Sequence, residues 1–512
     1  MKSNSNDTLD RRTRICVPIC ARTFAEIEIL VSRAADVADV IELRIDCVAE
    51  GEVSQFAERI AVITEHLAMP VIVTFRPAEE GGYRTITINE RKEFWQSMKA
   101  SPNVLFDIEY HLCTSEAVVR STNIICSNHY FAGVPEDLER IYERLAATPA
   151  RILKIAVHAN DAIDCLPIFR LLERAEKEGR ELIALAMGDA GLATRILGPS
   201  RGAFLTYAAL EEDSETAPGQ LTTAQMRSVY RIESITRQTQ VFGLVGSPVR
   251  HSISPHVHNA GFEAEGLDAL YMPFEVKDLH AFIKRMVHPN TRELDWDVGG
   301  LSVTAPHKLA VMRYLDWIDE RAVEIGAVNT VVVDGSKLRG YNTDVDGFIE
   351  PLVSAVELDR DSRVAVIGAG GAANAVLWSL KNHGVDVVLF ARNLQKGKKL
   401  GDKFEVSCEP LTGGTFEKFD VVVNATPLGS LGSLQNQTTA TADQLRGVRL
   451  AYDLVYNPIE TRFMREARAA GCKALGGMEM LVAQARRQFK LWTGKDGPAE
   501  VMQAAALRGL RG

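Results

Sequence analysis

From residue 14 to about residue 207, short apolar segments alternate with amphipathic stretches such as 24–36 and 136–147. Apolar strands separated by helical patterns are typical of a parallel sheet that is buried on both faces. The eight apolar segments are 15–20, 40–45, 71–75, 104–108, 124–126, 152–157, 182–186 and 203–207. Eight such units predict a compact (β/α)8 TIM barrel, and a sheet of six or seven strands is the alternative.

The pattern changes after a polar stretch at 211–220 and an amphipathic helix that we expect over 222–236. A new series of apolar segments begins near Val241, and a second division falls near residue 360, before a strand and a glycine-rich turn. The whole chain is therefore expected to be α/β. We predict a barrel domain over 1–237, an α/β substrate-binding domain over 238–360 that the C-terminal helices 478–512 rejoin, and a Rossmann-type domain over 361–477.

Composition and charge exclude several classes of protein. The 512 residues suffice for about two to four domains, and the net charge of −9 gives no reason to expect nucleic acid or a membrane surface as a partner. No apolar run is long enough for a transmembrane helix. Residues 1–14 are polar and lack the apolar core of a signal peptide.

Eight cysteines are spread over the chain, and the nearest pair, Cys16 and Cys20, has no His or Cys companions for a zinc site. We expect all eight to be reduced thiols in a cytoplasmic protein without a bound metal. The sequence does not indicate an oligomeric state.

A glycine-rich turn follows the strand predicted at 363–367. The segment 368–372 (GAGGA) would let the pyrophosphate of a dinucleotide approach the backbone at a helix N-terminus. The next strand ends at Arg392, with Lys396 four residues later, where an NAD site usually has an acidic residue. Two cations suit a 2′-phosphate and favour NADP(H). The alternatives are a plain strand–helix turn and a solvated basic loop.

Further motifs in the second half are 246–259 (GSPVRHSISPHVHN), 302–308 (SVTAPHK), 326–330 (GAVNT), 341–344 (YNTD), 424–429 (NATPLG) and 480–484 (MLVAQ). Together with the glycine turn they stand in the order found in shikimate dehydrogenases, and the chain from about residue 241 to its end resembles that family. Two positions depart from the family pattern. Ser302 stands where many bacterial members have Asn, and 391–393 reads Ala-Arg-Asn in place of Asn-Arg-Thr.

This resemblance implies NADPH-dependent reduction of 3-dehydroshikimate, with Lys308 and Asp344 as the catalytic pair. A lysine and a carboxylate in contact can pass a proton to a ligand oxygen, although a structural ion pair is the alternative. The substrate-binding residues that it implies are Ser252, Ser254, Thr304, Asn329, Tyr456 and Gln484. The cofactor-binding residues are Gly368, Ala369, Gly370, Gly371, Ala372, Arg392, Lys396, Thr426, Leu454 and Gly477.

In the first half, charged residues stand at the predicted C-terminal ends of strands, where the active sites of TIM barrels lie. Charges that face a barrel interior are costly unless they bind a polar ligand or one another. Lys154 lies between Leu153 and Ile155, so we expect partial desolvation that favours the neutral amine needed for a Schiff base. A lysine that reaches solvent from the strand end is the alternative, as is a structural role for His129. The charged set is Glu42, Arg44, Asp46, Arg76, His129 and Lys154.

Around these residues the chain resembles type I 3-dehydroquinate dehydratase, from about residue 14 to residue 236. The matching stretches include 42–46 (ELRID), 74–76 (TFR), 80–82 (EGG), 191–195 (GLATR) and 216–220 (TAPGQ). The resemblance implies that Lys154 forms an imine with the substrate ketone and that His129, assisted by Glu80, is the general acid–base. It places Glu42, Arg44, Arg76, Arg195, Thr216 and Gln220 in the substrate pocket. Tyr130 departs from the family, which often has Asp there, and Thr216 replaces a common Ser.

The two resemblances fit together, because dehydration of 3-dehydroquinate yields 3-dehydroshikimate, which the second half would reduce to shikimate. The chain is thus similar to the bifunctional dehydratase–dehydrogenase fusions of aromatic amino-acid biosynthesis, with these small molecules and NADP(H) as its partners. Its first residues lack the length and composition of the plastid leader expected in plant members. Alternatives are use of quinate or NAD by the second half, and a ligand-sensing protein without turnover. The ligand-sensing alternative is disfavoured because Lys154, His129, Lys308 and Asp344 are all present.

Overall fold

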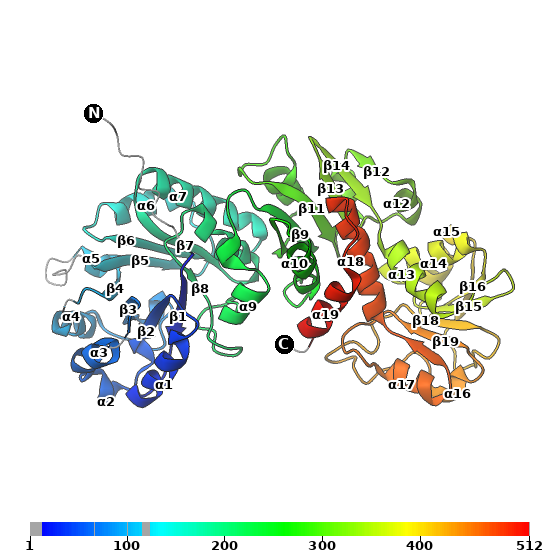
Figure 1. Cartoon of the computed structure of the whole chain (residues 1–512), viewed down its shortest axis with the longest axis horizontal. Coiled ribbons are helices and arrows are strands. Elements are labelled where there is room, and N and C mark those ends of the chain that lie inside the picture. The colour runs from blue at the N-terminus through cyan, green and yellow to red at the C-terminus, as the bar shows by residue number, and fades with distance from the viewer. Residues whose placement is uncertain (1–12, 66, 100, 115–122, 511–512) are drawn as a thin grey trace.

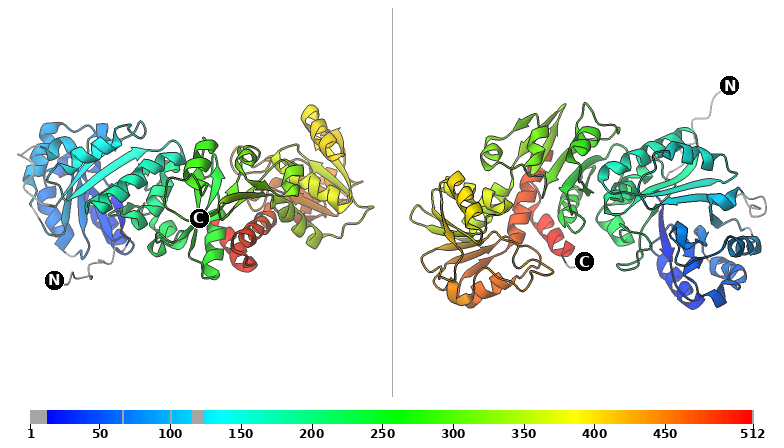
Figure 2. Two further views of the ribbon diagram at one scale, coloured as in Figure 1. Left: turned by 90° about the horizontal axis from the view of Figure 1, so that it is seen from above. Right: turned by 180° about the vertical axis from the view of Figure 1, so that it is seen from behind.

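The computed structural model describes residues 13–65, 67–99, 101–114 and 123–510, which form a barrel followed by two α/β domains (Figure 1). The barrel lies at one end of an elongated molecule, the domain drawn in green lies in the middle, and the yellow and orange domain lies at the other end (Figures 1 and 2). The prediction about a signal peptide concerns residues that lie almost entirely outside the described ranges.

Eight parallel strands form the barrel, in the order β7-β6-β5-β4-β3-β2-β1-β8. The strands are β1 (Ile15–Ile19), β2 (Val40–Arg44), β3 (Val71–Thr74), β4 (Val104–Glu109), β5 (Ile124–Tyr130), β6 (Ile152–His158), β7 (Glu181–Met187) and β8 (Thr206–Tyr207). The ring closes where the Phe204 N–H donates to the Leu182 carbonyl (2.8 Å). The predicted barrel of eight strands is confirmed.

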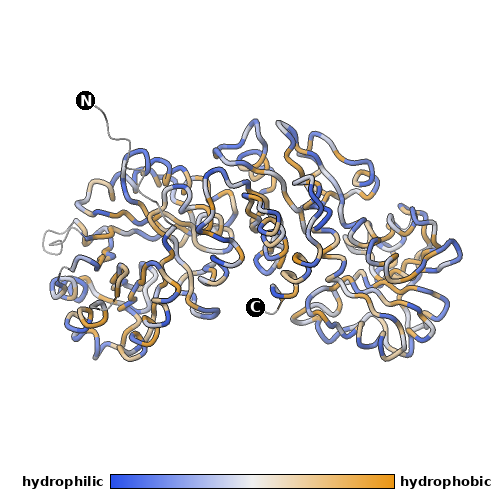
Figure 3. The backbone as a smooth tube through the Cα atoms, viewed as in Figure 1, coloured by the Kyte–Doolittle hydropathy of each residue, from blue (hydrophilic) through white to orange (hydrophobic). Residues whose placement is uncertain are grey.

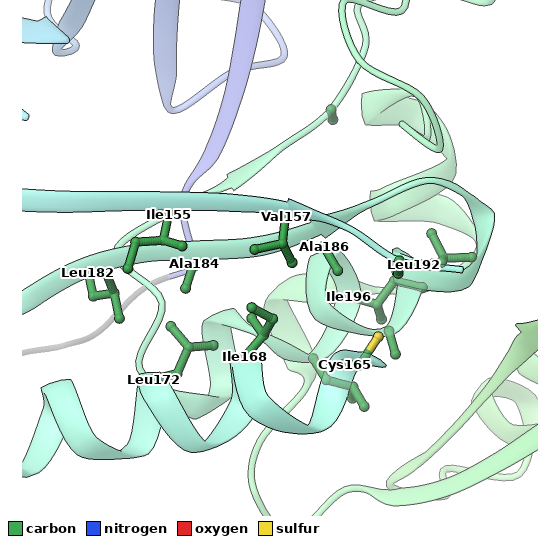
Figure 4. Packing of buried hydrophobic residues seen from close by; sticks show 14 of the residues in the cluster. Ile155, Val157, Cys165, Ile168, Leu172, Leu182, Ala184, Ala186, Leu192 and Ile196 are labelled. Carbon is green, nitrogen blue, oxygen red and sulfur yellow. The ribbon is translucent and has the colours of Figure 1, made fainter. Parts of the chain in front are cut away.

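Alternation along each strand separates two environments. Ile155 and Val157 of β6 point outward and pack against Ile168 and Leu172 of α7 (Cys165–Lys177), as Figure 4 shows. Inward-facing apolar side chains form a second buried cluster, the floor of the barrel. The floor includes Val40, Ile72, Leu105, Ile125, Ile152, Ile183 and Leu205. The inward-facing polar side chains therefore lie above it, toward the carboxyl ends of the strands.

Helices cover the outside of the barrel, and in every domain the apolar stretches lie mainly inside the outline of the chain (Figure 3). The helices of the first half are α1 (Phe24–Ala35), α2 (Glu50–Val53), α3 (Phe56–Glu65), α4 (Ile88–Ser97), α5 (Tyr110–Cys113), α6 (Leu138–Ala146), α7, α8 (Leu192–Leu197) and α9 (Thr223–Ser228).

The middle domain contains a mixed sheet in the order β10-β9-β11-β13-β14-β12. Its strands are β9 (Gln240–Gly246), β10 (Ala269–Glu275), β11 (Val298–Val303), β12 (Trp317–Ile318), β13 (Thr330–Asp334) and β14 (Lys337–Tyr341). Its helices are α10 (Ser254–Ala264), α11 (Leu279–Phe282), α12 (Glu320–Ile325) and α13 (Asp344–Ala355).

The third domain contains a parallel sheet in the order β17-β16-β15-β18-β19-β20, which is a doubly wound Rossmann arrangement. Its strands are β15 (Arg363–Ile367), β16 (Asp386–Ala391), β17 (Ser407–Pro410), β18 (Val421–Asn424), β19 (Leu450–Asp453) and β20 (Lys473–Leu475). Its helices are α14 (Gly371–His383), α15 (Leu394–Phe404), α16 (Ala442–Leu445) and α17 (Arg462–Ala469).

The last two helices, drawn in red in Figure 1, return to the middle domain. These are α18 (Gly477–Thr493), which packs against α13, and α19 (Ala499–Gly509), which packs against α10. Phe489 of α18 and Met502 of α19 share a buried cluster with Phe242 and Phe262. The core of the middle domain is therefore completed by the end of the chain.

Two expectations from the sequence are wrong. The helix expected over 222–236 is limited to α9, because Arg231 adopts a left-handed backbone conformation (φ 48°) before a short 3₁₀ turn. Cys20 and Cys47 form a disulfide, so not all eight cysteines are thiols. They follow the adjacent parallel strands β1 and β2, whose ends bring the two Cα atoms to 5.4 Å. This pairing removes the cysteine argument for a cytoplasmic location.

Within the described residues, no helix combines the length and the apolar character needed to cross a membrane.

Phe489 tests whether the C-terminal helices hold the middle domain together. Its side chain is fully buried, and its ring lies 5.3 Å from that of Phe262. We expect Phe489→Ala to lower the free energy of unfolding by about 3–5 kcal/mol, because it opens a cavity in this core. Urea unfolding of the full chain measures the change. Val501→Ala on α19, where the side chain is 38% exposed, is the control. Equal effects of the two substitutions would contradict this packing.

Candidate active sites

The amine of Lys154 lies in a buried group of charged side chains inside the barrel. It donates a hydrogen bond to Asp107 Oδ2 (2.7 Å) and another to the Tyr207 hydroxyl (2.8 Å), and Glu42 Oε1 is 3.6 Å away. Its two chain neighbours belong to the outward-facing cluster. Strand alternation therefore sends the two neighbours outward and leaves the amine among carboxylates, in a side chain that is 5% exposed.

Asp107 balances two buried cations. Its Oδ2 lies 2.8 Å from Arg76 Nη2 as well as 2.7 Å from Lys154 Nζ. Burial alone would raise the pKa of this carboxyl, but Arg76 and Lys154 hold the pKa of Asp107 well below its ordinary value. Glu42, the second buried acid, accepts a hydrogen bond from the Thr74 hydroxyl (2.5 Å). Two positive and two negative groups are thus held together away from water.

His129 lies on β5, the strand beside the one that carries Lys154. Its Nδ1 is 2.5 Å from Arg76 Nη1. Because a guanidinium can only donate, Nδ1 accepts and the proton of the neutral imidazole is on Nε2. Burial, and then the charge of Arg76, lower the pKa of His129 well below its ordinary value. Glu80 Oε2 lies 3.3 Å from the same nitrogen, and burial raises the pKa of Glu80.

Arg195 lies against the loop 211–220, which follows β8. Its Nη2 donates to the Pro218 carbonyl (3.3 Å), and among the described residues its Nε and Nη1 have no hydrogen-bond partner. Burial lowers the pKa of Arg195 to about 10. In the same loop, the Thr216 N–H donates to Gln220 Oε1 (2.9 Å). A buried guanidinium with unsatisfied donors suits an anionic ligand.

The mouth of the barrel is a cavity of about 410 Å³. Arg44 and Thr216 border it, together with the disulfide of Cys20 and Cys47. Arg44 makes a two-pronged ion pair with Asp46, with N–O distances of 3.0 and 2.7 Å. Of the predicted barrel residues, Arg44 and Thr216 thus border this cavity, whereas Glu42, Arg76 and Lys154 belong to the buried charged group of the interior.

A second cavity of about 410 Å³ lies where the middle domain meets the Rossmann domain. Helix starts and strand ends position its side chains: Ser254 begins α10 and Asp344 begins α13, while Tyr456 follows β19. Predicted residues that line it are Ser252, Ser254, Thr304, Lys308, Asn329, Asp344, Ala372, Leu454, Tyr456, Gly477 and Gln484. Residues that are far apart in the chain, from 252 to 484, thus share one cavity.

Lys308 and Asp344 form an ion pair in this cavity, with Nζ 2.6 Å from Oδ2. The other oxygen, Oδ1, accepts a hydrogen bond from Asn329 Nδ2 (2.8 Å). Asn329 is itself fixed, because its Oδ1 accepts from the Thr343 N–H (2.7 Å). The carboxylate is therefore oriented by two side chains, and the ammonium group of Lys308, whose side chain is 32% exposed, can donate to a ligand.

The glycine turn after β15 has the shape that a dinucleotide needs. Gly368 has φ +113°, and a Cβ there would lie 2.7 Å from the Thr426 methyl group, so the position requires glycine. A Cβ at Gly371 would meet no atom within 4 Å, which leaves room for a phosphate at the start of α14. Ala369 and Gly370 complete the turn between them.

Two other features belong to the predicted dinucleotide site. A Cβ at Gly477 would lie 2.4 Å from the Leu454 carbonyl, so glycine permits close packing of α18 on the loop after β19. Arg392 and Lys396 are exposed where β16 ends and α15 begins, and the Lys396 N–H donates to Asn393 (3.0 Å). The residues present therefore fit NADP(H), with the two cations available to a 2′-phosphate.

Comparison with protein families covers both halves. A model described as type I 3-dehydroquinase matches residues 15–237. The shikimate dehydrogenase substrate binding domain matches 244–331, and the shikimate 5'-dehydrogenase C-terminal domain matches 477–507. A bifunctional 3-dehydroquinate dehydratase/shikimate dehydrogenase, chloroplastic, from Arabidopsis thaliana is 31% identical over 98% of this chain and 85% of its own length.

The chain belongs to the bifunctional 3-dehydroquinate dehydratase/shikimate dehydrogenase family.

Two further relatives match the dehydrogenase half alone. A shikimate dehydrogenase (NADP(+)) from Oleidesulfovibrio alaskensis is 44% identical over 52% of this chain and 94% of its own. The crystal structure of shikimate 5-dehydrogenase from Thermus thermophilus in complex with NADP(H) and shikimate is 34% identical, covers 53% of this chain and 100% of its own, and has a TM-score of 0.47. The Arabidopsis relative and the family models together confirm the predicted family for the whole chain.

Sequence reasoning missed several residues that the structure places at the dehydratase site. Asp107 is a charged residue inside the otherwise apolar segment 104–108, which is the signal that could have found it, and its carboxylate meets the amine of Lys154 in the barrel interior. Tyr207, at the end of β8, carried no charge to draw attention to it. At the departure Tyr130, the hydroxyl accepts a hydrogen bond from Asn128 (2.9 Å).

In the dehydrogenase half, Gln488 was missed. It borders the cavity, is 2% exposed, and accepts a hydrogen bond from Ser302 (2.9 Å), the second departure from the family pattern. Gln488 also donates to the Thr330 hydroxyl (3.1 Å). Its place one turn beyond Gln484 on α18 is the signal in the sequence.

The lowered pKa of His129 predicts a pH dependence of stability. Below the ordinary value of 6.5, the unfolded chain takes up a proton at this histidine while the folded chain does not, so stability falls as the pH falls. We compare urea unfolding of the parental chain with that of His129→Gln, so that the titrations of groups away from His129 cancel. The unfolding free energy of the parental chain minus that of the variant should fall by about 2 kcal/mol as the pH is lowered from about 7 to about 5. A constant difference would mean that His129 titrates as it does in the unfolded chain.

Proposed function

We propose that the chain carries out two successive reactions. In the barrel, 3-dehydroquinate loses water to give 3-dehydroshikimate, and in the second half 3-dehydroshikimate is reduced to shikimate with NADPH. The observation that carries this proposal is the buried amine of Lys154, held between Asp107 and Glu42 beside a neutral histidine. The pair of Lys308 and Asp344, in the cavity beside the glycine turn, supports the second reaction.

In the dehydration, the amine of Lys154 attacks the ketone and the oxygen leaves as water, which gives an imine. The amine attacks in its neutral form, and Asp107 and Glu42, at 2.7 and 3.6 Å, hold it in place in the barrel interior. The positive imine acidifies the adjacent C–H bond. Loss of that proton and of the neighbouring hydroxyl then forms the double bond, and hydrolysis of the imine frees the amine.

His129 moves the protons in this sequence. In the structure Arg76 donates a hydrogen bond to Nδ1 of His129, which keeps the ring proton on Nε2. This hydrogen bond must break before Nε2 can accept a proton. An anionic substrate that draws the guanidinium of Arg76 toward itself would release the ring. Nδ1–H could then donate to Glu80, whose carboxylate lies 3.3 Å away, and Nε2 would become the base.

Arg195 receives the carboxylate of the substrate in this proposal. Its Nε and Nη1, which have no hydrogen-bond partner in the described part of the chain, supply two donors, and burial strengthens their attraction for an anion. Thr216 and Gln220, which bond to one another in the loop above, contact the ligand hydroxyls. Arg44 completes the pocket at the mouth.

In the reduction, NADPH supplies the hydride. Lys308 donates a proton to the oxygen of the reacting carbonyl, and Asp344 and Asn329 hold that ammonium group in place. Ser252 and Ser254, whose hydroxyls lie 3.1 Å apart, bind the carboxylate of the substrate. Gly371 and the start of α14 hold the pyrophosphate, and Arg392 and Lys396 hold the 2′-phosphate. The NADP(+) in the names of the dehydrogenase relatives supports this choice of cofactor.

A cytoplasmic location remains a proposal. The name of the Arabidopsis relative places that protein in the chloroplast.

A two-reaction assay tests the proposal. With 3-dehydroquinate alone, the parental chain should accumulate 3-dehydroshikimate. With NADPH added, shikimate should appear in an amount equal to the NADPH consumed. Product analysis by chromatography, with NADPH absorbance, measures both reactions. Accumulation of neither product would overturn the proposal, and shikimate formed with NADH but not NADPH would overturn the cofactor assignment.

Two variants each remove one reaction in this assay, and each is the control for the other. Lys154→Ala should lower the rate of dehydration by at least about 10³-fold, since it removes the nucleophile, and should leave reduction of added 3-dehydroshikimate unchanged. Lys308→Ala should lower reduction by about 10²–10⁴-fold and leave dehydration unchanged. Loss of both activities in either variant would show that the two halves are not independent sites.

A further inference from the structure

Ion pairs connect the two halves of the chain, and one of them joins the loops of both active sites. Arg250 lies in the dehydrogenase loop 247–254, two residues before Ser252. Its Nη1 is 2.6 Å from Asp189 Oδ1, and its Nη2 is 2.5 Å from Glu215 Oε1. Both acids belong to the dehydratase half, and Glu215 immediately precedes the predicted substrate-binding residue Thr216.

The two acids lie on neighbouring loops of the barrel that also contact each other directly. The Gly188 N–H, next to Asp189, donates to the Pro218 carbonyl (3.1 Å), which is also the acceptor for Arg195. A Cβ at Gly219 would lie only 2.5 Å from the Gly188 carbonyl, so the loops are in tight contact. Arg250 therefore bridges two loops that together cover Arg195.

The charge of Glu215 acts on Arg195. Burial is the main influence on the pKa of Arg195, but the negative charge of Glu215 raises that pKa and the positive charge of Arg250 lowers it. Glu215 stands three residues before Pro218, whose carbonyl accepts a hydrogen bond from Arg195 (3.3 Å), so it lies in the loop that contacts this guanidinium. A glutamate without its partner would compete with the substrate for Arg195, because both are carboxylates.

We propose that Arg250, although it lies in the dehydrogenase half, is a positioning residue of the dehydratase site. Its guanidinium holds Glu215 and Asp189 and keeps the carboxylate of Glu215 away from Arg195, so that Arg195 remains available to 3-dehydroquinate. The inference rests on the proposed function of the barrel. Because the Arg250 side chain is 32% exposed, its ion pairs are weakened by salt.

Dehydration kinetics without NADPH test this role. Arg250→Ala should raise the KM for 3-dehydroquinate about fivefold and change kcat by less than about twofold, since the reactive residues are untouched. Arg250→Lys, which can reach only one carboxylate at a time, should give an intermediate KM. The double variant Arg250→Ala/Glu215→Gln should return the KM to within about twofold of the parental value, because the competing charge is gone.

Arg170→Ala is the matched control. Arg170 of α7 pairs with Glu293 across the same junction between the halves (2.5 Å), but neither residue belongs to an active-site loop. This variant should leave the KM for 3-dehydroquinate at its parental value. Raising the ionic strength should increase the KM of the parental chain more than that of Arg250→Ala.

Three results would overturn the inference. They are an unchanged KM in Arg250→Ala, an equal increase of the KM in Arg170→Ala, and a double variant whose KM is as high as that of Arg250→Ala. The parental assay separates these results from a failure of the proposed function. A parental chain that does not dehydrate 3-dehydroquinate refutes that function. If the parental chain is active and Arg250→Ala leaves the KM unchanged, only the role of Arg250 is refuted.

Discussion

A charge that is removed from water needs an opposite charge beside it, and the dehydratase site is built on this constraint. Lys154 and Arg76 are 5% and 3% exposed, and Asp107 contacts both of them. The apolar floor beneath them excludes water, so removing the acid would leave two buried cations undercompensated, at a cost of about 3–5 kcal/mol. The same contacts that stabilise the barrel thus hold the reactive amine beside His129.

The dehydrogenase half meets the same requirement at a domain boundary. Lys308 is partly exposed, and its partner Asp344 is oriented by Asn329 in a cavity that the Rossmann domain closes. Hydride transfer needs the cofactor and the substrate to meet, and a cavity shared by two domains allows this. Arg250 adds a connection between the two catalytic halves, because it belongs to the substrate loop of the dehydrogenase and its side chain binds Asp189 and Glu215 of the dehydratase.

Much of this architecture could be predicted because local patterns determine it. Short apolar runs, several of them rich in Val and Ile, marked the eight barrel strands, and motif order marked the second half. Contacts between distant segments could not be predicted in this way. The disulfide of Cys20 and Cys47 joins residues 27 positions apart at the ends of paired strands, and Asp107 acquires its role only when β4 and β6 face the same interior. The carboxylates beside Lys154 could not be predicted from its chain neighbours for the same reason, since sequence neighbours face the opposite side of a strand.

The imine at Lys154 is the central claim, and trapping it is the most direct test. Borohydride added while the chain turns over 3-dehydroquinate without NADPH would reduce an imine to a stable amine, and peptide mass spectrometry would locate the added mass. We predict that the adduct is on Lys154 and is absent from Lys154→Ala. An adduct on another lysine, or one that persists in Lys154→Ala, would contradict the account.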